Sequence, residues 1–169
     1  MRRPKAARPV MPGYGIRKGP KGLLTWTHVE ERMSGSRNYW VATTRPDGRP
    51  HVMPVWGVWV EGRFYFSTDR GSRKGRNLAQ QPAITVHLES GDDAVILEGA
   101  ASLVTDATLL SAIDDAYNGK YGIRVVGHPG DSGIYAVTLQ KVFAWREKDF
   151  PVSATRWQFT PEEPGPGRQ

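Results

Sequence analysis

The pattern of apolar and polar residues predicts a chain built mainly of β-strands. Apolar side chains recur at alternate positions in segments bounded by Gly, Pro, Asp and Ser, which is typical of strands joined by tight turns. Six segments have this character: residues 38–44, 51–60, 63–68, 83–89, 94–104 and 133–146. Helices do not alternate with these segments, and most connections have hairpin length. The pattern therefore predicts an antiparallel barrel with peripheral helices rather than a parallel sheet.

Helix signals lie between these strands. Thr27 is followed three residues later by Glu30, which is the spacing of a capping box. Asp106 is a suitable N-cap for a later helix. We therefore expect helices over residues 27–33, 74–81 and 107–117.

The first two strands are expected to form a hairpin. Residues 45–49 read Arg-Pro-Asp-Gly-Arg. Pro46 suits the first central position of a tight turn, and Gly48 can adopt a positive φ. The connection is short enough to make the two strands antiparallel neighbours.

The second predicted strand, residues 51–60, has no polar face. One face carries His51, Met53, Val55 and Trp59, and the other carries Val52, Trp56, Val58 and Val60. Because both faces are largely apolar, we expect the domain core to cover one and a ligand or a second subunit to cover the other. Pro54 donates no ladder hydrogen bond, so pairing is expected to be interrupted there.

The positive charge of the chain is concentrated at its N-terminus. Of 23 basic residues, seven lie within residues 1–22, before the first acidic residue at Glu30, so the rest of the chain carries 16 basic and 17 acidic residues. We therefore predict a flexible basic arm over residues 1–22, a domain over residues 23–160 and a disordered tail over residues 161–169. The arm is interpreted as a solvated tail, with weak anion or nucleic-acid contact as the alternative.

Several protein classes are excluded by composition. The chain has no cysteine, so disulfides, thiolate metal sites and a cysteine nucleophile are absent. The longest strongly apolar run, residues 55–60, is far shorter than a membrane-spanning helix. The four histidines are too scattered for a recognisable metal site, so no metal is predicted. A cytoplasmic protein without nucleic-acid or membrane partners is expected.

Residues 66–78 carry the clearest candidate chemistry. A strand ends, Gly71 permits a bend, and a helix begins within Ser72-Arg73-Lys74. The first N–H groups of a helix lack partners within it, and the helix dipole favours an anion there. Arg73 can hold phosphate oxygens in a planar fork, while Lys74 adds a point charge. On its own, the segment slightly favours an ordinary capped helix carrying solvated charges over an anion site.

Six motifs, taken in order, resemble the pyridoxamine 5′-phosphate oxidase-like superfamily, and more narrowly its flavin and deazaflavin oxidoreductase branch. They are residues 39–44, 45–57, 64–68, 71–78, 95–99 and 155–159. The resemblance spans roughly residues 11 to 160. It implies a split β-barrel, which is a six-stranded antiparallel Greek-key barrel, and a homodimer with cofactor sites at the subunit interface.

The resemblance also implies roles for particular residues. The ring and ribityl region of the cofactor would be lined by His51, Val52, Met53, Pro54, Val55 and Trp56. Ser67 and Thr68 would lie beside the phosphate, and Arg73 and Lys74 would hold it with help from Ser72 and Asn77. Arg156 and Trp157 would lie near the ring. No residue is assigned as catalytic, but Tyr39 and His51 are candidates for reaching the substrate or the ring.

Two departures from the family pattern bear on activity. The C-terminal segment Thr155-Arg156-Trp157-Gln158-Phe159-Thr160-Pro161 lacks the substrate-phosphate pattern of the oxidases, so pyridoxamine phosphate oxidation is not transferred. Trp56 stands where flavin-binding members favour a lysine, which favours the deazaflavin coenzyme F420 over FMN. Hydride transfer to an unsaturated or quinone-like small molecule is the expected reaction.

Three alternatives remain open from sequence. The protein could use FMN, it could carry a flavin or deazaflavin without turnover, or the basic arm could bind nucleic acid. The arm could also contact the acidic tail of the deazaflavin coenzyme.

Overall fold

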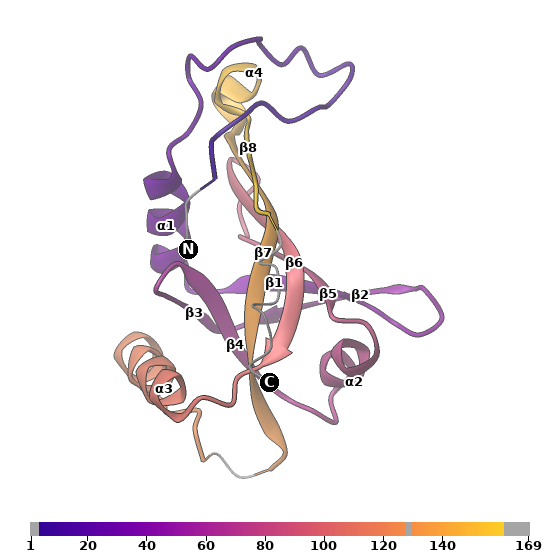
Figure 1. Ribbon diagram of the computed structural model, residues 1–169, viewed down its shortest axis with the longest axis vertical. Helices are drawn as coiled ribbons and strands as arrows, with labels where there is room; N and C mark the ends of the chain where they lie inside the picture. Colours follow the sequence, from indigo (N-terminus) through magenta and orange to yellow (C-terminus); the bar gives the residue numbers. More distant parts are fainter. Residues whose placement is uncertain (1–3, 128–129, 161–169) are drawn as a thin grey trace, which may run out of the picture.

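The computed structural model describes residues 4–127 and 130–160, and over these residues the chain forms one antiparallel eight-stranded sheet with helices around it (Figure 1). The strands are β1 (Tyr39–Thr44), β2 (Pro50–Val55), β3 (Gly57–Val60), β4 (Arg63–Asp69), β5 (Ala83–His87), β6 (Asp93–Leu103), β7 (Ser132–Arg146) and β8 (Thr155–Gln158). The helices are α1 (Trp26–Gly35), α2 (Arg73–Gln80), α3 (Ala107–Tyr121) and α4 (Phe150–Ser153), with a 3₁₀ turn at Glu147–Asp149. Within the described residues, no helix is both long and apolar enough to cross a membrane.

The sheet curls into a half-barrel. Its strand order is β2-β1-β5-β6-β7-β4-β3, and β8 is added beside β7. Strands β2 and β3 are the two ends of this order, yet they are separated in sequence only by Trp56. The chain can pass directly from one to the other only because the sheet bends round until its ends approach. The predicted mainly antiparallel, barrel-like class is therefore confirmed.

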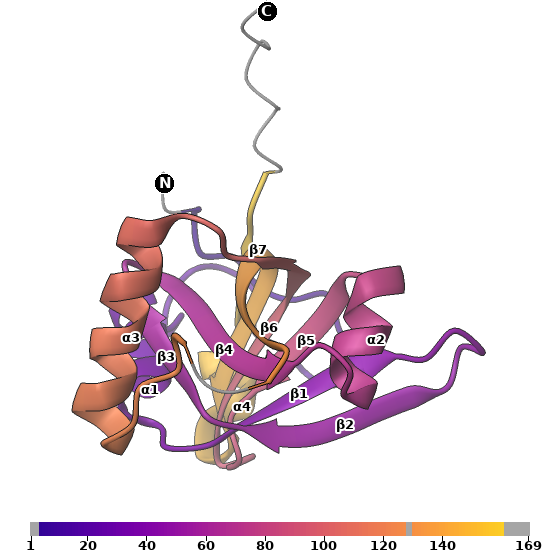
Figure 2. The same cartoon turned by 90° about the horizontal axis from the view of Figure 1, so that it is seen from below.

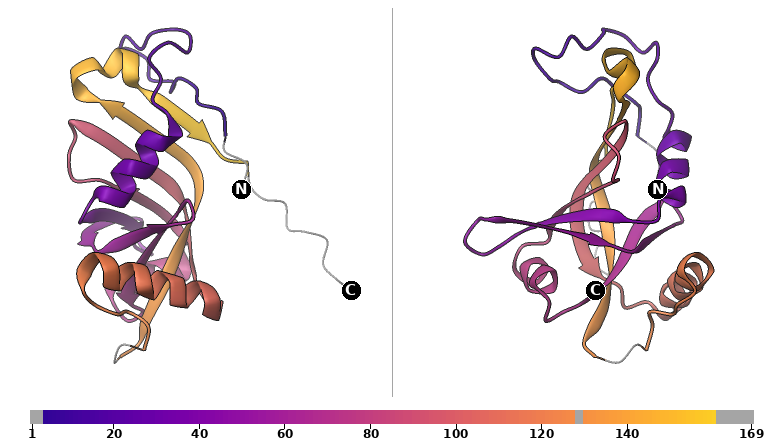
Figure 3. Two further views of the ribbon diagram at one scale, coloured as in Figure 1. Left: turned by 90° about the vertical axis from the view of Figure 1, so that its left-hand side faces the viewer. Right: turned by 180° about the vertical axis from the view of Figure 1, so that it is seen from behind.

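The β1–β2 hairpin forms as predicted and projects from the rest of the sheet (Figure 3). The N–H of Gly48 donates to the carbonyl of Arg45 (2.9 Å), and Gly48 has a φ of 81°. That backbone conformation is one that residues with a Cβ rarely adopt, which explains the glycine.

Two predictions about the second strand were wrong. Residues 51–60 form two strands, because the chain turns at Trp56 to reach the other end of the sheet. Pairing is not interrupted at Pro54, which lies opposite Trp40 in regular register. Proline is tolerated there because β2 is an edge strand with only one neighbour.

The helix limits also differ from the sequence expectation. Helix α1 is capped by Thr25, whose Oγ1 accepts from the N–H of His28 (3.3 Å), so it begins earlier than a helix capped by Thr27. The earlier start turns Trp26 toward the sheet with Val29 and Met33. Helix α3 continues four residues beyond the predicted end, to Tyr121. The short strand β8 was not predicted.

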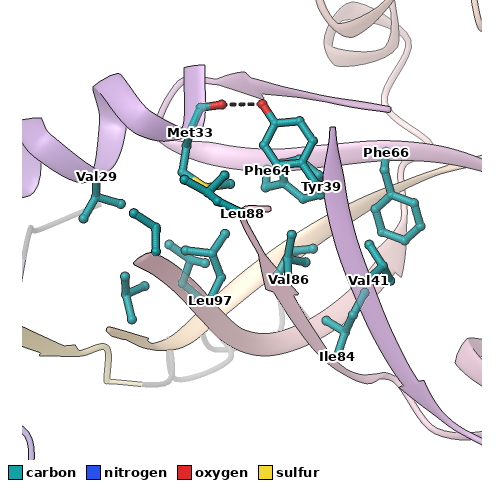
Figure 4. Packing of buried hydrophobic residues seen from close by; sticks show 14 of the residues in the cluster. Val29, Met33, Tyr39, Val41, Phe64, Phe66, Ile84, Val86, Leu88 and Leu97 are labelled. Atoms are coloured by element: carbon teal, nitrogen blue, oxygen red, sulfur yellow. Dashed lines mark hydrogen bonds between the residues drawn. The ribbon is translucent and has the colours of Figure 1, made fainter. Parts of the chain in front are cut away.

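The core fills the inside of the curl (Figure 4). Alternate residues of the strands, such as Val41, Phe64 and Leu97, pack there with Val29 and Met33 of α1. A second cluster lies on the other face of β3 and β4, where α3 packs with Ile113 and Tyr117 against Val58, Tyr65 and Ile134. Helix α3 therefore covers the outer face of β3, which was expected from the sequence to be covered by a ligand or a second subunit.

The N-terminal segment contacts the far end of the sheet. Ala7 pairs with Arg156 of β8 through two backbone hydrogen bonds of 2.9 and 2.7 Å. Arg8 donates through Nη1 to the carbonyls of Val152 (2.6 Å) and Ala154 (3.0 Å). This end, with β8 and α4, lies away from α2 and α3 (Figure 1). The predicted tail of residues 161–169 lies outside the described residues, and the domain limits stay a prediction.

Candidate functional site

Helix α2 begins where strand β4 ends, as the sequence predicts, and two hydroxyl groups meet at this junction. Ser72 is the N-cap, and its Oγ accepts from the N–H of Gly75 (3.1 Å). Thr68, on β4, places its Oγ1 3.2 Å from the same oxygen. Helix α2 begins at Arg73, one residue before the predicted start.

The first turn of α2 carries positive charge without a protein partner. Arg73 is exposed and Lys74 is half-buried, and within the described residues neither side chain forms a hydrogen bond or an ion pair. Their basic neighbours are engaged: Arg70 pairs with Asp131, and Nη1 of Arg76 donates to the carbonyl of Gly71 (2.6 Å). Burial lowers the pKa of Lys74 from its usual value, as expected for a cation held away from water with no anion beside it.

Gly75 allows the strand-to-helix turn to close tightly. A Cβ at this position would lie 2.5 Å from the carbonyl oxygen of Arg70 and 2.6 Å from that of Asp69. Both are backbone atoms that cannot move without displacing the turn. The glycine therefore fixes how closely the end of β4 approaches the first turn of α2.

His51 lies within electrostatic reach of this helix start. Burial, followed by the positive charges of Arg45, Lys74 and Arg73, lowers the pKa of His51. Its Nδ1 is buried and has no hydrogen-bond partner among the residues that the structure describes. A buried polar atom without a partner beside several cations is a position where an anionic ligand would be stabilised.

Asn77 lies beneath the helix start rather than on its surface. Its side chain has no exposed area, and Nδ2 donates to Oγ1 of Thr43 on β1 (2.9 Å). Oγ1 of Thr43 lies 3.4 Å from the carbonyl oxygen of His51. Asn77 therefore connects α2 to the β1–β2 hairpin, and its predicted contact with a phosphate stays a prediction.

A pocket of about 340 Å³ opens beside α2, between the end of β2 and the end of β4. It is lined by Pro54, Val55, Trp56, Ser67, Thr68, Lys74, Tyr117, Ile123, Val125 and Ser132. The first six residues were predicted from sequence as cofactor-binding, and the structure brings them together although they come from three separate segments. The last four were not predicted. Figure 2 shows α2 and α3 on either side of β4 at this end of the sheet.

The pocket exists because β2 and β4 diverge, and Tyr117 of α3 fills the base of the gap. Strand β3 pairs with β4 only as far as Gly57 opposite Phe66. Beyond that point, the hydroxyl of Tyr117 donates to the carbonyl of Trp56 (2.8 Å) and accepts from the N–H of Ser67 (3.0 Å). The tyrosine thus replaces the missing strand-to-strand hydrogen bonds.

Trp56 packs against Tyr121 and Arg37 at the edge of the pocket. Its ring stacks on Tyr121 with centroids 4.7 Å apart and planes inclined by 7°. The guanidinium of Arg37 lies 5.5 Å from the centre of the Trp56 ring. The side chain nevertheless remains 41% exposed, so it presents an ordered apolar surface to a ligand.

Lys120 anchors the same region from α3. Its Nζ donates to the hydroxyl of Tyr39 (2.7 Å) and to the carbonyl of Gly57 (3.1 Å). Burial, with a smaller contribution from Arg37, lowers the pKa of Lys120 to about 8. This lysine therefore ties α3 to β1 and to the start of β3.

The structure does not bring all of the predicted residues to the pocket. Tyr39 has no exposed area, and burial raises its pKa. Its hydroxyl donates to the carbonyl of Met33 (Figure 4) and also lies 2.9 Å from the carbonyl oxygen of Ser36. Val52 and Met53 are exposed on β2 but do not line the pocket.

Arg156 and Trp157 also lie far from the pocket of their own chain. They lie on β8, which pairs with β7 over Lys141–Ala144, whereas the pocket includes Ser132 at the opposite end of β7. Trp157 is buried in the core, with its ring edge-on to Trp26 at 5.5 Å. Among the described residues, no group of three or more metal-ligating side chains comes together.

The signals that would have identified the missing residues are weak in the sequence. Tyr117 and Tyr121 have the i, i+4 spacing of an ordinary apolar helix face. Ile123 and Val125 follow that helix in a connecting segment. Nothing local relates them to residues 54–68, because only the packing of α3 against β3 and β4 makes them neighbours.

Comparisons with known proteins agree with this fold. The family model described as Pyridoxamine 5′-phosphate oxidase matches residues 26–146, well over half of the chain. No curated protein matches.

Among solved structures, a conserved hypothetical protein of Mycobacterium tuberculosis, Rv2991, is 20% identical, with a TM-score of 0.66 over 77% of this chain and 89% of that one. An F420 reductase is 24% identical, with a TM-score of 0.52 over 66% and 94%. The heme storage protein HutZ from Vibrio cholerae is 18% identical, with a TM-score of 0.61 over 70% and 92%. At these identities the likeness concerns the fold. From the family match and this shared fold, the chain belongs to the pyridoxamine 5′-phosphate oxidase family and has the split β-barrel of its superfamily.

Proposed function

We propose that this protein is an oxidoreductase that binds a phosphate-bearing deazaflavin, coenzyme F420, in the pocket between β2, β4 and α2. The observation that carries the proposal is the pair of unpartnered cations, Arg73 and Lys74, at a helix start beside a pocket with an apolar lining. The volume of about 340 Å³ lies within the usual range for small-molecule sites of roughly 300–1,000 Å³.

The phosphate is assigned to the start of α2. Arg73 offers a planar fork of donors, and Lys74 adds a charge that is partly shielded from water by burial. The hydroxyls of Ser72 and Thr68 lie 3.2 Å apart and can turn toward the same anion. The free N–H groups of the first helical turn complete the set. An anion here would offset the positive charges of Arg73 and Lys74, which lower the pKa of His51.

The ring is assigned to the apolar part of the lining. Pro54, Trp56 and Ile123 offer flat or branched apolar surfaces, so they would exclude water from one side of the ring. Burial of that area contributes roughly 25 cal/mol per Å². A bound deazaflavin or flavin supplies hydride transfer to a small unsaturated or quinone-like acceptor, while the protein binds and orients it.

The choice of deazaflavin over FMN rests on Trp56. In the flavin-binding relatives that the sequence resembles, a lysine at this position supplies a hydrogen-bond donor. Here Trp56 is stacked on Tyr121 and offers no positively charged donor in its place. An F420 reductase among the structural neighbours supports the same choice, and FMN is the alternative.

A homodimer is part of the proposal. Residues in register across the sheet point to one face. Pro54, Trp40, His87, Ile96, Phe143 and Arg156 form such a row across six strands. The row is largely apolar, and it begins at the pocket and ends at β8.

A second copy packed on this row by two-fold symmetry would bring Arg156 of one subunit toward the pocket of the other. That arrangement would account for the predicted role of Arg156, which is remote from the pocket within its own chain.

The test is a parallel titration of the purified protein with F420 and FMN, with haemin as a third ligand because HutZ is described as a heme storage protein. We expect F420 to bind most tightly. Arg73→Ala with Lys74→Ala should weaken binding at least about tenfold, which corresponds to ~1.4 kcal/mol. Lys148→Ala, an exposed cation at the other end of β7, should leave it unchanged. Unchanged affinity in the double variant, or binding of haemin alone, contradicts the site.

Turnover separates an enzyme from a carrier. The protein, supplied with reduced F420, should oxidise it in the presence of a panel of quinones and unsaturated carbonyl compounds. Tight cofactor binding with no acceptor-dependent oxidation would instead support the carrier.

A further inference from the structure

One buried carboxylate holds the segment that closes the pocket. Asp114 lies on α3, is 7% exposed, and accepts through Oδ1 from the N–H groups of Val125 (2.6 Å) and Val126 (2.9 Å). Its Oδ2 accepts from Nη1 of Arg124 (2.7 Å). Three successive residues of the connection after α3 are therefore fixed by a single side chain.

The connection needs such an anchor because it lies outside the sheet. The chain leaves α3 through Gly122, which has a φ of 73°, and turns back along the helix. Residues 123–126 belong to no strand, so their N–H groups find no ladder partners. The carboxylate of Asp114 supplies the missing acceptors for two of them, and charged acceptors make the stronger hydrogen bonds.

The anchored segment supplies part of the pocket wall. Val125 is buried in the cluster beneath α3, while Ile123 is 39% exposed, and both line the pocket. Their side chains belong to its apolar part, together with Pro54 and Trp56. Apart from the hydroxyl of Tyr117 on α3, the polar groups of the pocket come from β4, α2 and β7, and none of these is among the hydrogen-bond partners that Asp114 has within the described residues.

We propose that Asp114 is a positioning residue that sets the ring-binding half of the pocket by holding Ile123 and Val125 in place. The inference rests on the proposed function, because it assigns the apolar half to a flat ring. The fit of the ring then depends on the carboxylate of Asp114, which does not line the pocket. Hydrogen bonds to Val125 and Val126 carry the effect, whereas the phosphate half at α2 is independent of them.

The neighbouring acid provides a matched control. Asp115 is exposed, and within the described part of the chain it accepts only from Nη1 of Arg124 (3.0 Å), with no backbone N–H among its partners. Asp115→Asn changes the charge by the same amount as Asp114→Asn and leaves the backbone anchor intact. In Asp114→Asn one neutral amide oxygen can serve either the two N–H groups or Arg124, and the amide nitrogen then faces the other donor, so the anchor is weakened. A general electrostatic effect would appear in both variants, whereas a positioning effect would appear only in Asp114→Asn.

The test separates the two halves of the ligand. Binding of riboflavin and 5-deazariboflavin, which carry the ring without phosphate, and of inorganic sulfate, which carries only the anion, is titrated on the full chain. In Asp114→Asn we expect the ring compounds to bind roughly tenfold more weakly, a loss of ~1.4 kcal/mol, and sulfate within about twofold of the wild type. Asp115→Asn should match the wild type for both.

A second variant covers the case in which Asp114→Asn does not fold. Ile123→Ala removes an exposed side chain from the wall itself and should also weaken only the ring compounds. Amide hydrogen exchange at Val125 and Val126 should be faster in Asp114→Asn if the anchor is lost.

The outcomes are distinguishable. A wild-type protein that binds no ring compound overturns the proposed function, and the positioning role with it. A wild type that binds the ring while Asp114→Asn, or failing that Ile123→Ala, binds it equally well overturns the positioning role alone. Equal loss of ring and sulfate affinity would show a general structural defect and would also overturn it.

Discussion

The hydroxyl of Tyr117 donates to the backbone carbonyl of Trp56 over 2.8 Å. This hydrogen bond joins a helix to the single residue at which the chain crosses from one end of the sheet to the other. The same hydroxyl accepts from the N–H of Ser67, so the tyrosine replaces backbone pairing at the point where β2 and β4 diverge. The gap between those strands is the candidate cofactor pocket, which therefore depends on α3 for its shape.

Tyr117→Phe should destabilise the protein by about 1–3 kcal/mol, because it leaves a carbonyl and an N–H in a half-buried site without their partner. Urea unfolding followed by tryptophan fluorescence measures this difference. Tyr14→Phe is the control, because Tyr14 is exposed and its ring only touches Phe150 edge-on. Equal stability of wild type and Tyr117→Phe would mean that the strands close the gap by themselves.

Two glycine-to-alanine substitutions should act in opposite directions. Gly75→Ala should destabilise the protein and weaken anion binding, since its Cβ would meet backbone atoms of Asp69 and Arg70. Gly119→Ala, inside α3 with nothing within 4 Å of its Cβ, should stabilise it by roughly 0.5–1 kcal/mol. Thermal unfolding of both variants, with and without sulfate, checks this pair. Stabilisation by both substitutions would show that α2 can shift freely.

The part of the site that is formed by residues close together in the chain could be predicted from the sequence. The turn at Gly48 and the strand-to-helix junction at Ser72 follow from short-range chemistry, and both form as expected. Ser67, Thr68 and Lys74 lie within one short stretch of chain, so a candidate anion site could be recognised there. The pocket contains all three.

The remaining wall could not be predicted, because it depends on packing between segments far apart in sequence. Tyr117 and Ile123 enter the pocket only because α3 packs on β3 and β4. The break at Trp56 was missed for a related reason: strand propensity continues through it, and the curl of the whole sheet decides where the chain turns. Tyr39 was a reasonable catalytic candidate until its hydroxyl proved to be buried against α1.

Val52→Asp should convert a dimer into a monomer if the outer face of the sheet is the subunit interface. Val52 lies on edge strand β2, is 45% exposed, and shares a face with Ala42 and Thr85. A carboxylate there would be buried without a partner in the dimer, at little cost to the fold of one chain. Analytical ultracentrifugation gives the mass, and Ser111→Asp, on exposed α3 surface, is the control. A dimer that survives Val52→Asp must use another face.

Anion binding at α2 should depend on pH through His51. Burial, followed by Arg45, Lys74 and Arg73, lowers its pKa in the folded protein. Between that lowered value and the unfolded value of about 6.5, the unfolded chain binds more protons, so the stability of the ligand-free protein should fall as pH decreases through this window.

A bound anion should reverse the effect, because negative charge beside His51 raises its pKa again. Protons are then taken up on binding, and affinity for the anion increases as pH falls. Sulfate is the suitable probe, since its own charge stays constant between about pH 5 and 8.

Sulfate titrations at both ends of this range, followed by thermal unfolding, should therefore show tighter binding and a larger stabilisation at the lower pH. His51→Gln should remove most of that difference, while His87→Gln, a partly buried histidine on β5, should retain it. If His51→Gln keeps the full pH dependence, the anion does not change the pKa of His51. The phosphate site then lies farther from β2 than the effect of Lys74 and Arg73 on the pKa of His51 indicates.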